Sequence, residues 1–76
     1  MKYYEIFVTS KRFNPAPRKT IMLAKMIDTA QHKIFWRVNR FELTQTGETW
    51  HNVHVGRHDF ATFRQAREFI QAEHER

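Results

Sequence analysis

The chain has 76 residues, no cysteine and a formal net charge of +5. This length suits a single small domain, residues 1–76, whose modest core excludes a deep substrate cleft, and the lack of cysteine excludes disulfides and cysteine zinc sites. Residues 1–40 hold nine Lys or Arg against two acidic residues, whereas residues 41–76 hold four against six, so the N-terminal half should attract polyanions.

The first predicted element is a strand over residues 3–9, where the side chains alternate between two faces. Glu5 interrupts the apolar stretch near the N-terminus that would otherwise resemble a signal-peptide core. Uncharged runs elsewhere are too short to span a bilayer. We therefore expect a soluble, cytoplasmic protein that does not bind a membrane.

Residues 10–19 are the most conspicuously basic segment of the chain. They contain four Lys or Arg and two prolines, which cannot donate ladder hydrogen bonds. We expect an exposed basic loop or hairpin tip here.

Residues 17–30 allow two interpretations. The run TIMLAKMI fits a strand buried on both faces, but Met22, Leu23, Met26 and Ile27 also form one helical stripe. The turn-like residues 28–32 favour a strand within a meander. A helix over residues 17–30 stays open as the alternative.

A hairpin follows along the chain. Residues 33–44 alternate as a strand, with Ile34, Trp36 and Val38 on one face and Phe35, Arg37, Asn39 and Phe41 on the other. The pair Thr46-Gly47 predicts a tight turn, because glycine tolerates a positive φ, and residues 50–55 return as the partner strand.

The chain ends with a predicted helix. Residues 56–59 break the strand pattern, and Thr62 with Gln65 forms a capping box. The expected buried stripe consists of Phe63, Ala66, Phe69 and Ile70, with Phe60 beneath it. Together the elements predict an α+β domain in which an antiparallel meander of three or four strands packs on one C-terminal helix.

Patterns typical of an enzyme or a metal site are weak. The chain has no Gly-rich phosphate loop, no GxSxG motif and no paired carboxylates, so we expect no enzyme and no cofactor, although a single catalytic histidine stays open. His51, His54 and His58 with Asp59 are suitable ligand types. On a strand, however, His51 and His54 point to opposite faces, and we expect no metal site.

Basic and aromatic residues give the clearest binding signal. Cations around Phe13 can grip phosphates, and arginines of the later strands can extend the contact surface. Phe35 and Phe41 share the Arg37 face, where they can stack on bases unless the helix packs there. The candidate nucleic-acid- or partner-binding residues are Lys11, Arg12, Phe13, Arg18, Lys19, Arg37, Arg40 and Arg57.

The last forty residues resemble, in layout, the sheet-plus-helix DNA-binding domains of the AP2 type, which include arm-binding domains of phage and transposon integrases. The resemblance rests on Trp36, Gly47, Trp50 and the helix entry at residues 60–62. It implies a three-stranded sheet in the major groove with Arg37 reading base edges. The N-terminal strand and proline-containing segment depart from that pattern, so no residue role is carried over.

These observations favour a small, non-enzymatic nucleic-acid-binding accessory protein, for DNA rather than RNA, from a phage or other mobile element. The alternative is a small inhibitor that blocks a larger host or defence protein, such as a nucleic-acid-binding complex, with Tyr3, Phe13 and Trp50 as anchors. A homodimer joined through sheet edges is compatible with both functions.

Overall fold

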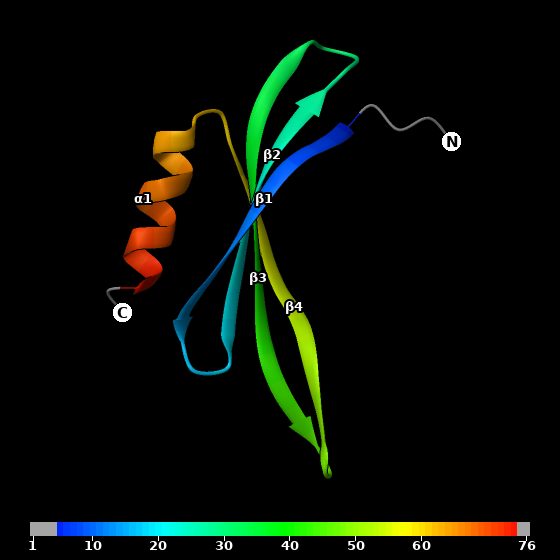
Figure 1. Ribbon diagram of the computed structural model, residues 1–76, viewed down its shortest axis with the longest axis vertical. Helices are drawn as coiled ribbons and strands as arrows, with labels where there is room; N and C mark the ends of the chain where they lie inside the picture. Colours follow the sequence, from blue (N-terminus) through cyan, green and yellow to red (C-terminus); the bar gives the residue numbers. More distant parts are fainter. Residues whose placement is uncertain (1–4, 75–76) are drawn as a thin grey trace.

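The computed structural model describes residues 5–74, which form four strands followed by one helix. The elements are β1 (Glu5–Ala16), β2 (Lys19–Asp28), β3 (Lys33–Thr46), β4 (Thr49–Phe60) and α1 (Phe63–His74). The strands form one antiparallel sheet in the order β1-β2-β3-β4 (Figure 1). The α+β class, the meander and the C-terminal helix are confirmed, with four strands; Tyr3 and Tyr4 lie outside the described residues.

The ambiguous segment is the inner strand β2. Ile21 and Leu23 are buried on the face that α1 covers, and Ala24 and Met26 are buried on the opposite face. A strand buried on both faces has a continuous apolar run, which explains why its sequence also fits a helical stripe. The strand interpretation is confirmed, and the helical alternative for residues 17–30 is wrong.

Residues 10–19, expected as an exposed loop or a hairpin tip, form a hairpin tip and not a loop. β1 continues to Ala16, and only Pro17 and Arg18 form the turn into β2. The prolines are tolerated because β1 is an edge strand and Pro15 lies at a register irregularity between Phe13 and Ala16. The segment is a hairpin tip built on an edge strand, and its basic side chains are exposed.

The expected break at residues 56–59 is also wrong, because β4 runs on to Phe60. A register shift opposite Arg40 and Phe41 absorbs one extra residue and lets the ladder continue. Gly56 marks a close approach rather than a turn, since a Cβ there would lie 2.6 Å from the Arg40 guanidinium. The glycine at the real turn is Gly47, whose φ is 63° as the hairpin prediction required.

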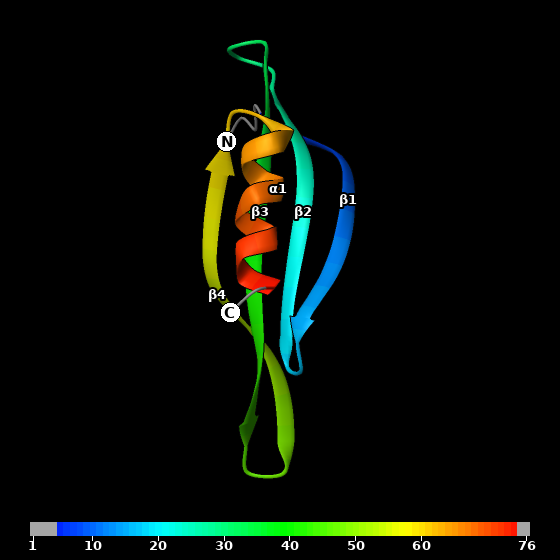
Figure 2. The same ribbon diagram turned by 90° about the vertical axis from the view of Figure 1, so that its left-hand side faces the viewer.

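The core lies between α1 and one face of the sheet (Figure 2). Val38 and Ala66 are fully buried, and Ile21, Leu23 and Ile70 complete the cluster. Phe60 and Phe69 pack against it partly buried, whereas Phe63, expected in the stripe, is 47% exposed. The helix begins as predicted, because the Gln65 amide donates to Thr62 Oγ1 and the Thr62 amide to Gln65 Oε1, each at 3.2 Å.

The molecule is long and thin, about 45 by 33 by 16 Å. The β3–β4 hairpin extends well past the end of α1 as a two-stranded arm (Figures 1 and 2). Within residues 5–74, no helix is long and apolar enough to cross a bilayer. Among the described residues, α1 covers one face of the sheet and no helix or strand covers the other (Figure 2).

Candidate nucleic-acid interface

The sheet face opposite α1, here called the open face, carries the best candidate site. Ladder pairing aligns Arg12, Met22, Asn39 and Arg57 across the four strands, on the side away from the core residue Val38. Side chains two positions along each strand share this face. Phe35, Arg37 and Phe41 therefore lie on the open face, as the aromatic hypothesis required.

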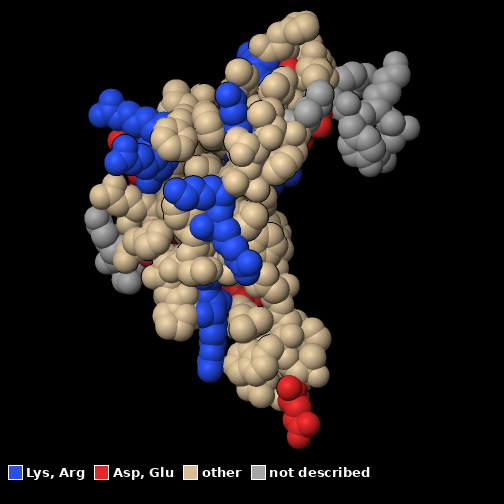
Figure 3. All heavy atoms as spheres, viewed as in Figure 1, with Lys and Arg blue, Asp and Glu red and all other residues tan. Residues whose placement is uncertain are grey.

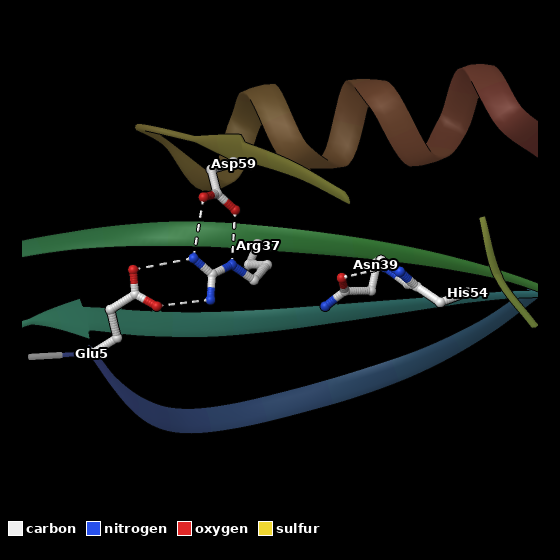
Figure 4. A network of polar contacts seen from close by, with 5 residues as sticks. All are labelled: Glu5, Arg37, Asn39, His54 and Asp59. Atoms are coloured by element: carbon white, nitrogen blue, oxygen red, sulfur yellow. Dashed lines mark hydrogen bonds and ion pairs between the residues drawn. The ribbon is translucent and has the colours of Figure 1, made fainter. Parts of the chain in front are cut away.

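Arg37 occupies one end of the open face between two carboxylates (Figure 4). Its Nη1 lies 2.9 Å from Glu5 Oε2, and its Nε lies 2.9 Å from Asp59 Oδ1. The other terminal nitrogen of the guanidinium, Nη2, donates to both carboxylates. The hydrogen bonds that Arg37 donates to Asp59 and then to Glu5 raise the pKa of Arg37 above its ordinary value, despite partial desolvation.

This arrangement changes the role expected of Arg37. Its side chain is only 12% exposed, and two anionic partners compete with any phosphate or base edge. The ion pairs join β1, β3 and β4 across the sheet. Arg37 therefore connects strands in this conformation. Its guanidinium is not free to make the base-edge contacts in the major groove that the layout resemblance implied.

The middle of the open face combines aromatic and amide groups. His54 Nε2 lies 2.9 Å from Asn39 Oδ1 in a hydrogen bond (Figure 4). The centroid of the His54 ring is 5.2 Å from that of the Phe41 ring. Trp50 and Asn52 follow His54 along the same side of β4, because register is regular between these positions. The open face thus continues onto the β3–β4 arm as a row of planar groups.

The opposite end of the open face is a basic groove. It forms a hollow of about 450 Å³ where the tip of the β1–β2 hairpin meets the base of the arm. Its basic lining residues are Arg12, Arg18 and Lys19, and no carboxylate belongs to its described lining. Lys19 borders the groove from the α1 side, where it pairs with Glu42 across the ladder and also lines a smaller hollow with Glu42 and Glu73. The remaining lining residues are Asn14, Ala16, Pro17, Thr20, Leu43 and Asn52.

Arg18 is the residue that joins the hairpin tip to the arm. It adopts φ of 67°, in the left-handed region, within the Pro17–Arg18 turn. Its carbonyl accepts a 2.7 Å hydrogen bond from the Leu43 amide. Its guanidinium lies 4.5 Å from the centroid of the Trp50 ring, a cation–π geometry. These contacts hold the cation over an aromatic surface beside the groove.

The other predicted binding residues are dispersed. Lys11 and Phe13 lie on the α1 side of β1, with the Lys11 ammonium 5.3 Å from the Phe13 ring centroid. Arg40 also lies on that side, where its Nη1 is 3.9 Å from Glu73 and its Nε is buried without a hydrogen-bond partner. Arg57 is exposed on the open face. The structure therefore brings Arg12, Arg18 and Lys19 together and separates the rest.

Charge is unevenly distributed over the surface. Figure 3 shows Lys and Arg side chains over the middle of the molecule and at the end of the β1–β2 hairpin. An acidic side chain stands at the far tip of the arm, where Glu48 follows Gly47 in the turn. The basic groove lies between this acidic tip and the carboxylates around Arg37.

Sequence reasoning missed three polar groove residues, Asn14, Thr20 and Asn52, and did not include Trp50 among the candidate nucleic-acid-binding residues. The Gly47 turn fixes the hairpin register and with it the pairing of Leu43 with Asn52, so this part of the groove was accessible from the sequence. The approach of the β1–β2 tip to the arm depends on sheet twist, which local patterns do not specify.

Histidine geometry agrees with the strand argument. No register shift separates His51 and His54, so they lie on opposite faces of β4. Among residues 5–74, no group of three or more His, Asp or Glu side chains is placed to hold a metal ion.

Comparison with known proteins adds no family to this geometry. No protein-family model, curated protein or solved structure matches the chain. The interpretation of the open face therefore rests on its residues alone.

Proposed function

We propose that this protein is a non-enzymatic nucleic-acid-binding accessory protein whose basic groove contacts the phosphate backbone. The observation that carries the proposal is that Arg12 and Arg18 line one hollow without a lining carboxylate, with Lys19 at its border. Guanidinium and ammonium groups bind phosphate oxygens through charge-assisted hydrogen bonds, and their release of counterions drives association. DNA is the expected polymer ahead of RNA.

The groove also provides polar groups for orientation. Asn52 and Thr20 line it beside the cations, and amide and hydroxyl groups commonly contact phosphate or sugar in nucleic-acid complexes. Neither side chain neutralises the positive field. Phosphate contact accordingly explains the groove's composition better than solubility alone, which would disperse cations over the surface.

The test is fluorescence anisotropy with labelled single- and double-stranded DNA and RNA at several salt concentrations. We expect a Kd in the micromolar range or tighter at low salt. If three cations each contact one phosphate, the slope of log K against log salt lies between about −2 and −3. Replacing Arg12 and Arg18 together with Glu should abolish binding without changing the circular dichroism spectrum, and should lower the melting temperature only slightly, because Arg18 loses its contact with Trp50.

A matched control reverses two charges elsewhere. Arg64 and Arg67 are exposed on α1, and α1 covers the opposite face of the sheet. The double variant R64E/R67E has the same net charge as R12E/R18E but leaves the groove intact, so it should retain most of the affinity. Equal loss in both doubles, or no loss in R12E/R18E, would contradict the groove as the site.

One specific observation supports the second candidate, a protein-binding inhibitor. A hollow of about 370 Å³ between β1 and α1 is lined largely by apolar side chains, among them Phe13, Leu23, Phe63 and Ile70. Such a groove can accept an apolar anchor from a partner protein. Failure to bind any nucleic acid at low salt would make this candidate the leading one.

A further inference from the structure

We infer that the nucleic acid held by the basic groove is a single strand, with a base stacked on Trp50. This inference rests on the proposed function and adds the form of the polymer. It depends on the shape of the groove, on the exposed Trp50 ring and on the charges at the other end of the open face.

The groove has the form of a small hollow with an apolar wall. Leu43 and Ala16 contribute apolar lining, and the three cations stand around it. Bases in a duplex are stacked inside the helix, so a duplex can offer this hollow only its phosphates. A single strand has unstacked bases that can enter such a site while the backbone stays on the cations.

Trp50 supplies the stacking surface next to the hollow. It is 41% exposed, although an indole of this size normally finds more cover in a folded domain. It shares its side of β4 with the groove residue Asn52. Arg18 lies over one face of the ring, so a base stacks on the other face or displaces the guanidinium, and either way one cation stands beside the phosphate of that nucleotide.

The row continues from Trp50 toward the centre of the sheet. Trp50 and His54 are four residues apart on a regular strand, about 13 Å along its axis. Asn52 lies between them on the same side, and Phe41 packs against His54. Alternating rings and amides suit successive bases, because rings stack and amides bond to base edges.

The far end of the open face disfavours a long rigid ligand. Glu5 and Asp59 stand there around Arg37, and Asp28 pairs with Glu5 in the ladder. A duplex lying along the whole sheet would bring its phosphates close to these carboxylates, at a cost in electrostatic repulsion. A flexible strand can instead remain on the basic groove and the arm.

The test compares one labelled oligonucleotide alone, annealed to its complement, and as RNA of the same sequence, with the intact protein at one salt concentration. We expect the single strand to bind about tenfold more tightly than the duplex, the size of one base–aromatic stack. Tryptophan emission should be quenched on binding. Preferential binding of single-stranded DNA or of single-stranded RNA supports the inference, and comparison of the two identifies which polymer is preferred.

Trp50→Leu is the decisive variant. It should weaken single-strand binding about tenfold, leave duplex binding and the salt slope unchanged, and lose the quench, with Trp36 the remaining indole. Trp50→Phe, which keeps a ring, should recover much of the affinity. Phe63→Leu removes another exposed aromatic ring, on the α1 side, and should bind like the unmodified protein.

The outcomes separate this inference from the proposed function. If duplex and single strand bind equally and Trp50→Leu has no effect while R12E/R18E abolishes binding, the inference is overturned and phosphate binding at the groove stands. If no nucleic acid binds at low salt, the proposed function fails and the inference fails with it.

Discussion

At one end of the open face Arg37 lies between two carboxylates, whereas at the other end Arg12 and Arg18 line a groove with none in its described lining. All three residues were predicted to bind a polyanion. In the folded sheet, Arg37 uses its guanidinium to tie strands together, whereas Arg12 is exposed and the exposed Arg18 lies over the Trp50 ring. The difference lies in the neighbours that folding supplies.

Those neighbours are distant along the chain. Arg37 is 32 residues from Glu5 and 22 from Asp59, and only the meander brings the three side chains together. Arg12 lies opposite Met22 on its neighbouring strand, so no carboxylate faces it there. Cross-strand pairing therefore separates Arg37, which ties strands together, from the arginines proposed to bind a ligand, and variants at each end should affect different properties.

The largest effect on stability is expected from Arg37→Met. Met keeps much of the apolar stem but leaves Glu5 and Asp59 facing each other without a cation. We expect the free energy of unfolding to fall by about 2 kcal/mol, a value already reduced for the solvent that reaches both carboxylates. Chemical denaturation at neutral pH measures it, and nucleic-acid affinity should change by less than about twofold.

The stabilisation by Arg37 should not change when denaturation is measured at a moderately alkaline pH instead of at neutral pH. The pKa of Arg37 is raised in the folded state, so its stabilisation is fully present below the ordinary pKa of arginine and is lost only as pH rises beyond it. Arg37→Lys should be intermediate, because an ammonium keeps the charge but cannot reproduce the fork of hydrogen bonds. A large loss of affinity in Arg37→Met, with the fold intact, would show that Arg37 binds the ligand.

A smaller loss of stability is expected from Thr62→Ala. This change removes the side-chain acceptor for the Gln65 amide at the start of α1, on the side of the sheet opposite the groove. The free energy of unfolding should fall by about 1 kcal/mol, with unchanged affinity. Thr62→Ser keeps a hydroxyl and should be nearly neutral. Weaker binding by Thr62→Ala than by Thr62→Ser would show that affinity follows stability, and the two ends of the open face would then not be independent.

Local sequence patterns were sufficient for most of the fold. Alternation in residues 33–44, the turn at Gly47 and the Thr62–Gln65 capping box each specify a structure within a few residues, and each was predicted correctly. Errors arose where strand context decides. Pro15 is compatible with a strand only because β1 is an edge strand. Gly56 lies within β4, where the lack of a side chain leaves room for the Arg40 guanidinium and does not mark a turn.

The candidate site was less accessible for the same reason. Alternation placed Arg37 and Arg40 on opposite faces in principle, but only the sheet shows that Glu5 and Asp59 surround one and Glu73 approaches the other. Arg12, Arg18 and Lys19 were found from their clustering along the chain. Their association with Asn52 and Trp50 depends on tertiary structure, which composition and periodicity do not contain.

The smallest expected effect is a change in affinity when the two carboxylates around Arg37 are neutralised, so that this end of the open face resembles the basic groove. In E5Q/D59N, Arg37 keeps its charge but loses its anionic partners, and it lies two positions along β3 from Asn39, in the ladder row that contains Arg12. A strand bound in the groove can then extend past Arg12 to an additional phosphate contact. We expect affinity at low salt to rise about threefold and the salt slope to steepen by about one contact. The control E48Q/E68Q removes the same charge from the arm tip and from α1, away from the carboxylates around Arg37. If both doubles increase affinity equally, net charge alone is responsible; a gain confined to E5Q/D59N shows that paired carboxylates are what keep Arg37 out of the binding surface.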